Sequence, residues 1–115
     1  MSEQPKPFRG AFVFRSHDHQ ILTSTYFNTG DREPYPETAK RIKAGTIAQD
    51  PFAGTFRTVW LQGDGSYELN LEISRHAGSS LYELTWTGRA GVEYRGEGVL
   101  EKEILFGYYW GVPGE

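Results

Sequence analysis

The sequence predicts an all-β protein: an antiparallel meander of about seven or eight strands that closes into a barrel, with one short helix. Three observations lead to this prediction. Aromatic residues make up 15% of the chain although only 37% of it is hydrophobic, so the apolar material lies in few, large side chains. Apolar and polar residues alternate along several segments, as in strands with one buried face. Turn signals rich in glycine separate these segments.

Length, charge and cysteine content exclude several classes of protein. The 115 residues suffice for one domain, which we place at residues 8–115 after a disordered lead-in at 1–7. The formal charge of −3 argues against a general nucleic-acid or anionic-membrane binder. The absence of cysteine excludes disulfides and thiol chemistry. No apolar run reaches membrane-spanning length and no signal-peptide pattern is present, so we expect a cytoplasmic protein without a membrane partner.

The first two strands are predicted at residues 8–15 and 21–27. In the first, Phe12 and Phe14 share one side of the alternating pattern, and Arg15 lies on the other. The polar residues 16–19 predict a turn. The second segment is rich in Thr, Tyr, Ile and Phe, which favours a strand paired with the first.

Residues 28–52 are predicted to form a Pro-rich, helical insert. Pro34 and Pro36 lack backbone donors, which argues against a central strand. A short helix is expected at residues 37–44, because Pro36 suits the first helical position. Its C-terminal end carries the cations that a helix dipole favours there, Lys40, Arg41 and Lys43.

The strand at residues 53–62 has two alternative registers. In one register Arg57 faces inward as a buried cation that awaits an anion. In the other, Phe56, Thr58 and Trp60 face inward and Arg57 is solvated. We favour the second register because it buries more aromatic area.

The remaining strands form consecutive hairpins, beginning with a tight turn at residues 63–65. Strands are expected at 66–74, 82–87, 92–100 and 103–110. The inward residues of the first three are Tyr67, Leu69, Leu71 and Ile73, then Tyr82, Leu84 and Trp86, then Val92, Tyr94, Gly96 and Gly98. The last strand is apolar on both faces, and we place Tyr108 and Trp110 on the inner one.

Gly96 and Gly98 lie on the same face of one predicted strand. Glycine is unfavourable inside a strand unless packing or curvature requires it. We therefore expect large rings, such as those of Trp86 and Tyr82, to lie over a bare backbone. The alternative is a ligand that approaches this backbone.

Two motifs carry a resemblance: Tyr82-x-Leu84-x-Trp86 and Tyr94-x-Gly96-x-Gly98, followed by an apolar strand that ends in an aromatic residue. Over residues 53–111 the chain resembles the calycin-type meander of small lipocalin-like and avidin-like β-barrels. The resemblance implies an antiparallel barrel, often with a cavity for a small molecule. It assigns no ligand residues, because the biotin-contact pattern of avidins and the Gly-x-Trp signature of lipocalins are absent.

Six aromatic side chains on the predicted inner faces are the candidate ligand-binding residues: Trp60, Tyr82, Trp86, Tyr94, Tyr108 and Trp110. Aromatic rings with polar tips suit a pocket for a ligand that is apolar but needs a few hydrogen bonds. A barrel of this size is filled by its own side chains or holds one small ligand. Both outcomes stay open at this point.

No set of residues predicts catalysis, a metal or a cofactor. His17 and His19 lack a third ligand nearby, and a solvated turn explains them. The glutamates of the predicted strands, which could supply an acid–base pair, are explained by a polar outer face. A solvated helix face explains the basic cluster at residues 40–43 better than an acidic partner does. An enzyme is therefore disfavoured.

Two function classes remain. The first is a binding protein for a small, partly apolar or aromatic ligand held in an aromatic-lined barrel. The alternative is a homodimerising protein–protein interaction module without such a ligand. In the alternative, Leu105 and Tyr109 face outward from the last strand and form the interface.

Overall fold

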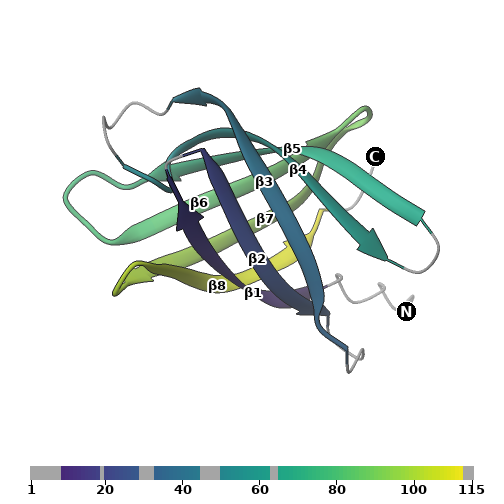
Figure 1. The fold of residues 1–115 in the computed structure, drawn as a ribbon, viewed down its shortest axis with the longest axis horizontal. Coiled ribbons are helices and arrows are strands. Elements are labelled where there is room, and N and C mark those ends of the chain that lie inside the picture. The colour runs from purple at the N-terminus through teal and green to yellow at the C-terminus, as the bar shows by residue number, and fades with distance from the viewer. Residues whose placement is uncertain (1–8, 19, 29–32, 45–49, 63–64, 113–115) are drawn as a thin grey trace, which may run out of the picture.

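The computed structural model describes residues 9–18, 20–28, 33–44, 50–62 and 65–112. Strands make up most of these residues (Figure 1). Their bounds are β1 Arg9–His17, β2 Ile21–Asn28, β3 Tyr35–Ala44, β4 Gly54–Gln62, β5 Gly65–Arg75, β6 Leu81–Gly88, β7 Gly91–Glu101 and β8 Ile104–Gly111. The predicted lead-in at 1–7, together with Phe8, His19 and turn residues 63–64, lies outside the described residues. Within them, no helix is long and apolar enough to cross a membrane.

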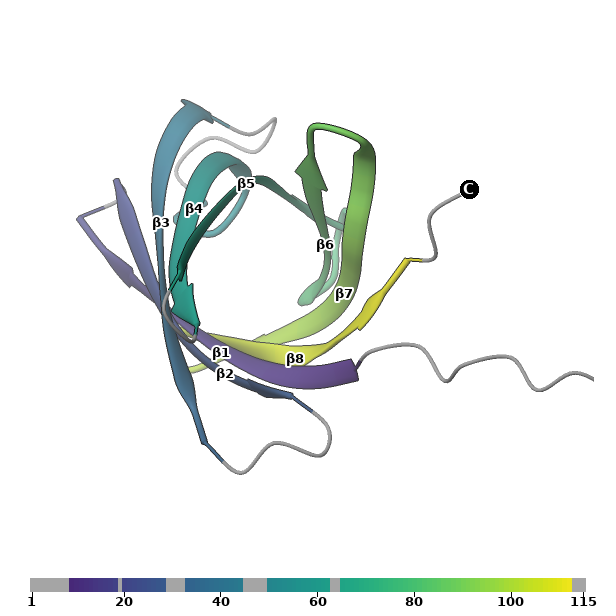
Figure 2. The same cartoon turned by 90° about the vertical axis from the view of Figure 1, so that its right-hand side faces the viewer.

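The strands follow one another around a closed barrel, as Figures 1 and 2 show. Each strand is antiparallel to both neighbours, and β1 closes the ring by pairing with β8 from Arg9↔Trp110 to Arg15↔Ile104. Closure leaves no strand with an exposed edge. The predicted all-β antiparallel barrel is confirmed.

The helix predicted at residues 37–44 is wrong, because these residues form most of β3. The strand pairs with β2 on one side and, from Glu37↔Trp60 onward, with β4 on the other. A helix of two turns is marginal alone, whereas the strand gains two ladders of hydrogen bonds. Pro36 is tolerated because it lies next to the start of the strand, before pairing with β4 begins. The described residues of the predicted insert at 28–52 thus include a wall strand, β3.

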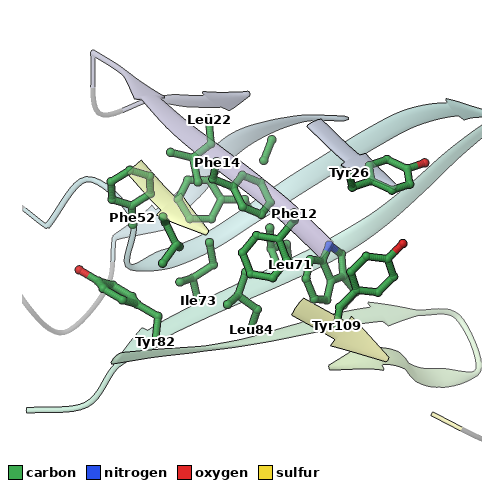
Figure 3. Packing of buried hydrophobic residues seen from close by; sticks show 14 of the residues in the cluster. Phe12, Phe14, Leu22, Tyr26, Phe52, Leu71, Ile73, Tyr82, Leu84 and Tyr109 are labelled. Atoms are coloured by element: carbon green, nitrogen blue, oxygen red, sulfur yellow. The ribbon is translucent and has the colours of Figure 1, made fainter. Parts of the chain in front are cut away.

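The inward side chains of the strands pack into one core, part of which Figure 3 shows. On β4, Phe56 and Thr58 are fully buried and Arg57 is exposed, which confirms the favoured register. Burying one large apolar side chain stabilises a fold by about 1.5–3 kcal/mol. Apolar side chains that are at most 2% exposed occur on seven of the strands and in the segment before β4: Phe12, Phe14, Leu22, Ala39, Phe52, Phe56, Leu71, Ile73, Tyr82, Leu84 and Leu105.

The inner face of β8 is the opposite of the predicted one. Tyr109 is buried, whereas Tyr108 is 53% exposed and packs against Trp110 on the outside, with ring centroids 5.7 Å apart. The strand register explains this choice, since Tyr109 pairs with Gly10 on β1 and with Gly96 on β7. Neither neighbour has a side chain, so the wall leaves room inside for the Tyr109 ring.

Gly96 is covered by large rings, as the sequence predicted, although Phe12 and not Tyr82 accompanies Trp86. A Cβ atom at this position would lie 3.1 Å from the Trp86 ring and 3.3 Å from the Phe12 ring. It would also lie 2.8 Å from the backbone carbonyl of Tyr108 on the neighbouring strand. The glycine therefore allows both rings to pack against the wall of the barrel.

One end of the barrel is closed by the segment that precedes β4. The Asp50 carboxylate is buried and accepts hydrogen bonds from the Phe52 amide and the Tyr82 hydroxyl, each at 2.9 Å. Arg75 Nη1 lies 3.8 Å from the same carboxylate. These contacts satisfy a buried charge, which would otherwise be costly, and they hold Phe52 in the core beside Tyr82 (Figure 3).

Arg41 fastens this closing segment from β3. It donates hydrogen bonds to the carbonyl oxygens of Ala53 at 2.5 Å and Pro51 at 2.9 Å, and its guanidinium lies 4.7 Å from the centre of the Phe56 ring. The side chain that was expected on a solvated helix face is therefore part of the closed end. A planar group with several donors suits this combination of stacking and carbonyl binding.

Replacing Gly96 by alanine should destabilise the protein by about 1–3 kcal/mol, because the added methyl group overpacks a site bounded by backbone. Gly65→Ala is the matched control, since a Cβ there would meet only the Tyr67 ring at 3.9 Å. Urea unfolding of both variants measures the difference. Equal stabilities for the two variants would contradict the packing that we describe around Gly96.

Candidate functional site

The opposite end of the barrel holds a pocket, which we call the mouth pocket. Figure 3 shows Tyr26 and Tyr109 at this end and Phe52 and Tyr82 at the other. Six of the eight residues that line the mouth pocket are aromatic, and the other two are polar: Phe12, Tyr26, Asn28, Glu37, Trp60, Trp86, Tyr94 and Tyr109. They come from seven of the eight strands, so closure of the ring assembles the pocket.

The pocket is small inside and half open to solvent. About 40 Å³ of its interior is accessible to the centres of water-sized molecules. One water needs about 10–15 Å³ of such space, so the interior holds a few waters or a small chemical group. Trp60 and Tyr94 are only partly buried and stand at the rim. Tyr67, which is 51% exposed, stacks on Trp60 with ring centroids 5.6 Å apart and extends the rim outward.

Tyr109 organises the aromatic walls. Its ring centroid lies 6.0 Å from those of Trp86 and Tyr94 and 6.3 Å from that of Tyr26. These contacts are edge-on or tilted, which is the favoured geometry for aromatic pairs. The Tyr109 hydroxyl donates a hydrogen bond to Oδ1 of the buried Asn28. The walls are therefore held by contacts among their own residues.

Glu37 is the ionisable residue with the least exposure in this pocket, at 5%. Its carboxyl oxygen Oε2 accepts hydrogen bonds from the Thr58 hydroxyl and from Trp86 Nε1, the latter at 3.1 Å. Both bonds end on Oε2, and Oε1 takes part in neither. The carboxyl group is thus oriented through one of its two oxygens, in a residue that lines the pocket.

Burial raises the pKa of the Glu37 carboxyl above its ordinary value of 4.5, and the hydrogen bonds from Thr58 and Trp86 oppose that rise. The pKa of the Tyr109 hydroxyl is also raised, mainly by burial and further by nearby Tyr26. Burial likewise raises the pKa of the Tyr94 hydroxyl. These two phenols stay protonated at neutral pH and can donate hydrogen bonds.

The structure brings together half of the predicted ligand-binding residues. Trp60, Trp86 and Tyr94 line the mouth pocket. Tyr82 points instead into the closed end, where its hydroxyl binds Asp50. The predicted inner placement of Tyr108 and Trp110 is wrong, because the register of β8 turns both outward.

Five pocket residues were not selected from the sequence as candidates: Phe12, Tyr26, Asn28, Glu37 and Tyr109. Glu37 was assigned to a helix, and Tyr109 was assigned to the outer face. One signal could have found Glu37. A closed ring of antiparallel strands needs an even number of them, so a seven-strand count leaves one strand missing in the long insert. In such a strand Glu37 shares a face with Ala39.

The outer glutamates form surface contacts rather than a site. Arg57 pairs with Glu68 at 2.5 Å, His76 lies 3.6 Å from Glu83, and Tyr108 donates a hydrogen bond to Glu97. Exposed pairs of this kind contribute little to stability. His17 Nε2 lies 2.9 Å from the Thr23 hydroxyl. Among the described residues no group of three His, Cys, Asp or Glu side chains could hold a metal ion.

No family model, curated protein or solved structure matches the chain. Its function must therefore be inferred from the geometry of the mouth pocket.

Glu37→Gln should stabilise the protein at neutral pH. A carboxyl whose pKa is raised by folding binds a proton more strongly in the folded state, so stability falls as pH rises from about 4.5 toward the raised pKa. Each unit of elevation corresponds to about 1.4 kcal/mol lost above that pKa. Glutamine keeps an acceptor for Trp86 and removes this loss.

Melting temperatures of wild type and Glu37→Gln at pH 4 and pH 8 measure this effect. The variant should melt higher at pH 8, with a smaller difference at pH 4. Glu72→Gln, which removes an exposed carboxylate from β5, should show no such gain. A variant that is less stable than wild type at pH 8 would contradict the description of Glu37 as a buried, desolvated carboxyl group.

Proposed function

We propose that this protein binds a small, partly apolar molecule in the mouth pocket. The observation that carries the proposal is the composition of this partly open pocket: its walls combine six aromatic side chains with the carboxyl group of Glu37 and the amide of Asn28. Small-molecule sites are typically concave and mostly apolar, with a few placed polar groups. The resemblance of residues 53–111 to lipocalin-like and avidin-like barrels supports the same class of function.

The size of the pocket limits what is bound. An interior of about 40 Å³ accepts a compact polar head, and the apolar remainder of the ligand would lie at the rim against Trp60 and Tyr94. An eight-stranded barrel has room for one small ligand when its side chains do not fill it. Benzyl alcohol, a neutral molecule with one ring and one hydroxyl, is therefore a suitable probe.

The three tryptophans provide an internal control for this binding. Trp60 and Trp86 line the mouth pocket, whereas Trp110 lies on the outside. Titration with benzyl alcohol, followed by NMR of the three indole N–H signals, should shift those of Trp60 and Trp86 and leave that of Trp110 in place. Binding should also raise the melting temperature, because the ligand stabilises the folded state alone.

Tyr94→Ala and Tyr108→Ala form a matched pair of variants for the same titration. Each removes one tyrosine ring, the first from the rim of the pocket and the second from the outer face. Loss of one buried ring contact should weaken binding about tenfold for Tyr94→Ala alone. Equal shifts of all three indole signals, or no shift at millimolar probe, would overturn the proposal.

A second candidate function, homodimerisation, is favoured by one observation. An apolar block lies exposed on the outer face of β8, β1 and β2, with Phe27 52% and Phe106 43% exposed. Val13 is the register partner of Phe106, and Ala11 is the partner of both Phe27 and Tyr108. Exposed apolar patches of this kind mark association sites.

This surface differs from the interface that the sequence suggested, because Leu105 and Tyr109 are buried inside the barrel. If the block forms a dimer, light scattering should give twice the 13.0 kDa chain mass. Tyr108→Glu should then yield a monomer, since it places a charge in an apolar contact. Leu81→Glu, a change of an equally exposed residue on β6, should not. A wild-type monomer at high concentration would exclude this candidate.

A further inference from the structure

We propose that the ligand of the mouth pocket is a small primary amine that carries an apolar group and is bound as its ammonium form by Glu37. This inference rests on the proposed function and specifies the chemical class of its ligand. It depends on the charge and the geometry inside the pocket, which are considered in turn.

The charge balance of the lining favours a cation. Glu37 supplies a carboxyl group, and no lysine, arginine or histidine is among the eight lining residues. An anionic ligand would meet this carboxyl group with no basic side chain in the lining to compensate. A cationic ligand would instead provide the opposite charge that a buried carboxylate needs. Binding of the cation would draw the group into its ionised form.

The hydrogen bonds of Glu37 leave a place for the ligand. Thr58 and Trp86 both donate to Oε2, and together they fix the plane of the carboxyl group. Oε1 takes part in neither bond. An ammonium group has three N–H donors and could give one of them to Oε1. Tyr26 and Tyr109 line the same pocket, and a phenol oxygen can accept a hydrogen bond.

The aromatic walls suit a cation as well as an apolar group. Ring faces attract ammonium groups, and aromatic cages bind them most strongly where water is displaced. The rings of Tyr26, Trp86 and Tyr94 each already contact the Tyr109 ring. The cage is therefore formed before the ligand arrives, which lowers the entropic cost of binding.

The lining does not suit the two other simple occupants. A metal ion would need about four to eight ligands, mostly oxygen or nitrogen, and Glu37 is the one carboxylate among the lining residues. A wholly apolar ligand could not donate a hydrogen bond to Glu37 Oε1, and it would therefore bind more weakly than a ligand that can. A primary amine with an apolar group satisfies both parts of the pocket.

The test compares three probes that share one ring: benzylammonium, benzyl alcohol and benzoate. NMR titration of the Trp86 indole signal at neutral pH measures the affinity of the wild-type protein for each. Benzylammonium should bind at least about tenfold more tightly than benzyl alcohol, because hydrogen bonds to charged groups are the stronger ones. Benzoate should bind most weakly.

Glu37→Gln should remove the preference for benzylammonium, so that the variant binds benzylammonium and benzyl alcohol about equally. Glu72→Gln, with the same change in net charge on the outer face, should keep the preference. Equal affinities of wild type for the ammonium and the alcohol would overturn the amine inference while the proposed function stands. The comparison of benzylammonium with benzyl alcohol uses wild-type protein alone, so it tests the amine inference even if Glu37→Gln does not fold. Absence of binding by all three probes would overturn both.

Discussion

Closure of the ring between β1 and β8 is the constraint on which the rest of this structure depends. It gives every strand two antiparallel neighbours, and it makes β3 a wall strand although its local sequence pattern predicts a short helix. Closure also decides which way each side chain points. Tyr109 on β8 pairs with Gly10 on β1 and with Gly96 on β7, so there is room for its ring inside the barrel. The side chain of the preceding residue, Tyr108, then points outward.

Each end of the barrel holds a buried carboxyl group, and the two groups differ in how many of their oxygens are bound by other residues. At the closed end Asp50 is bound by two backbone amides and the Tyr82 hydroxyl, with Arg75 nearby. Such a group is fully engaged and serves the fold. At the mouth, Glu37 is held by one oxygen only, with no basic side chain in the lining. A carboxyl group that is buried at a cost to stability and only half engaged is the feature expected of a binding site.

The pocket and the packing of the barrel share the same residues. Phe12 and Trp86 pack over Gly96 and also line the mouth pocket. Tyr109 bridges Trp86, Tyr94 and Tyr26, so it supports the core and shapes the cavity together. The site is therefore built on rigid wall strands rather than on loops. This arrangement favours a preorganised pocket of fixed shape over one that forms around its ligand.

The sequence by itself determined the class of the fold and the inner face of most strands. Alternation placed Leu71 and Trp86 correctly, because in β5 and β6 one face is apolar and the other mostly polar, and the larger aromatic area of one face placed Phe56. Alternation failed where that contrast is missing: β8 is apolar on both faces, and β3 has a polar residue, Glu37, pointing inward. Only the tertiary structure decided that residues 35–44 form a strand and which face of β8 points inward, since pairing with strands distant in the sequence outweighs local preference. These two strands contribute Glu37 and Tyr109 to the mouth pocket, so neither side chain could be placed there from local pattern alone.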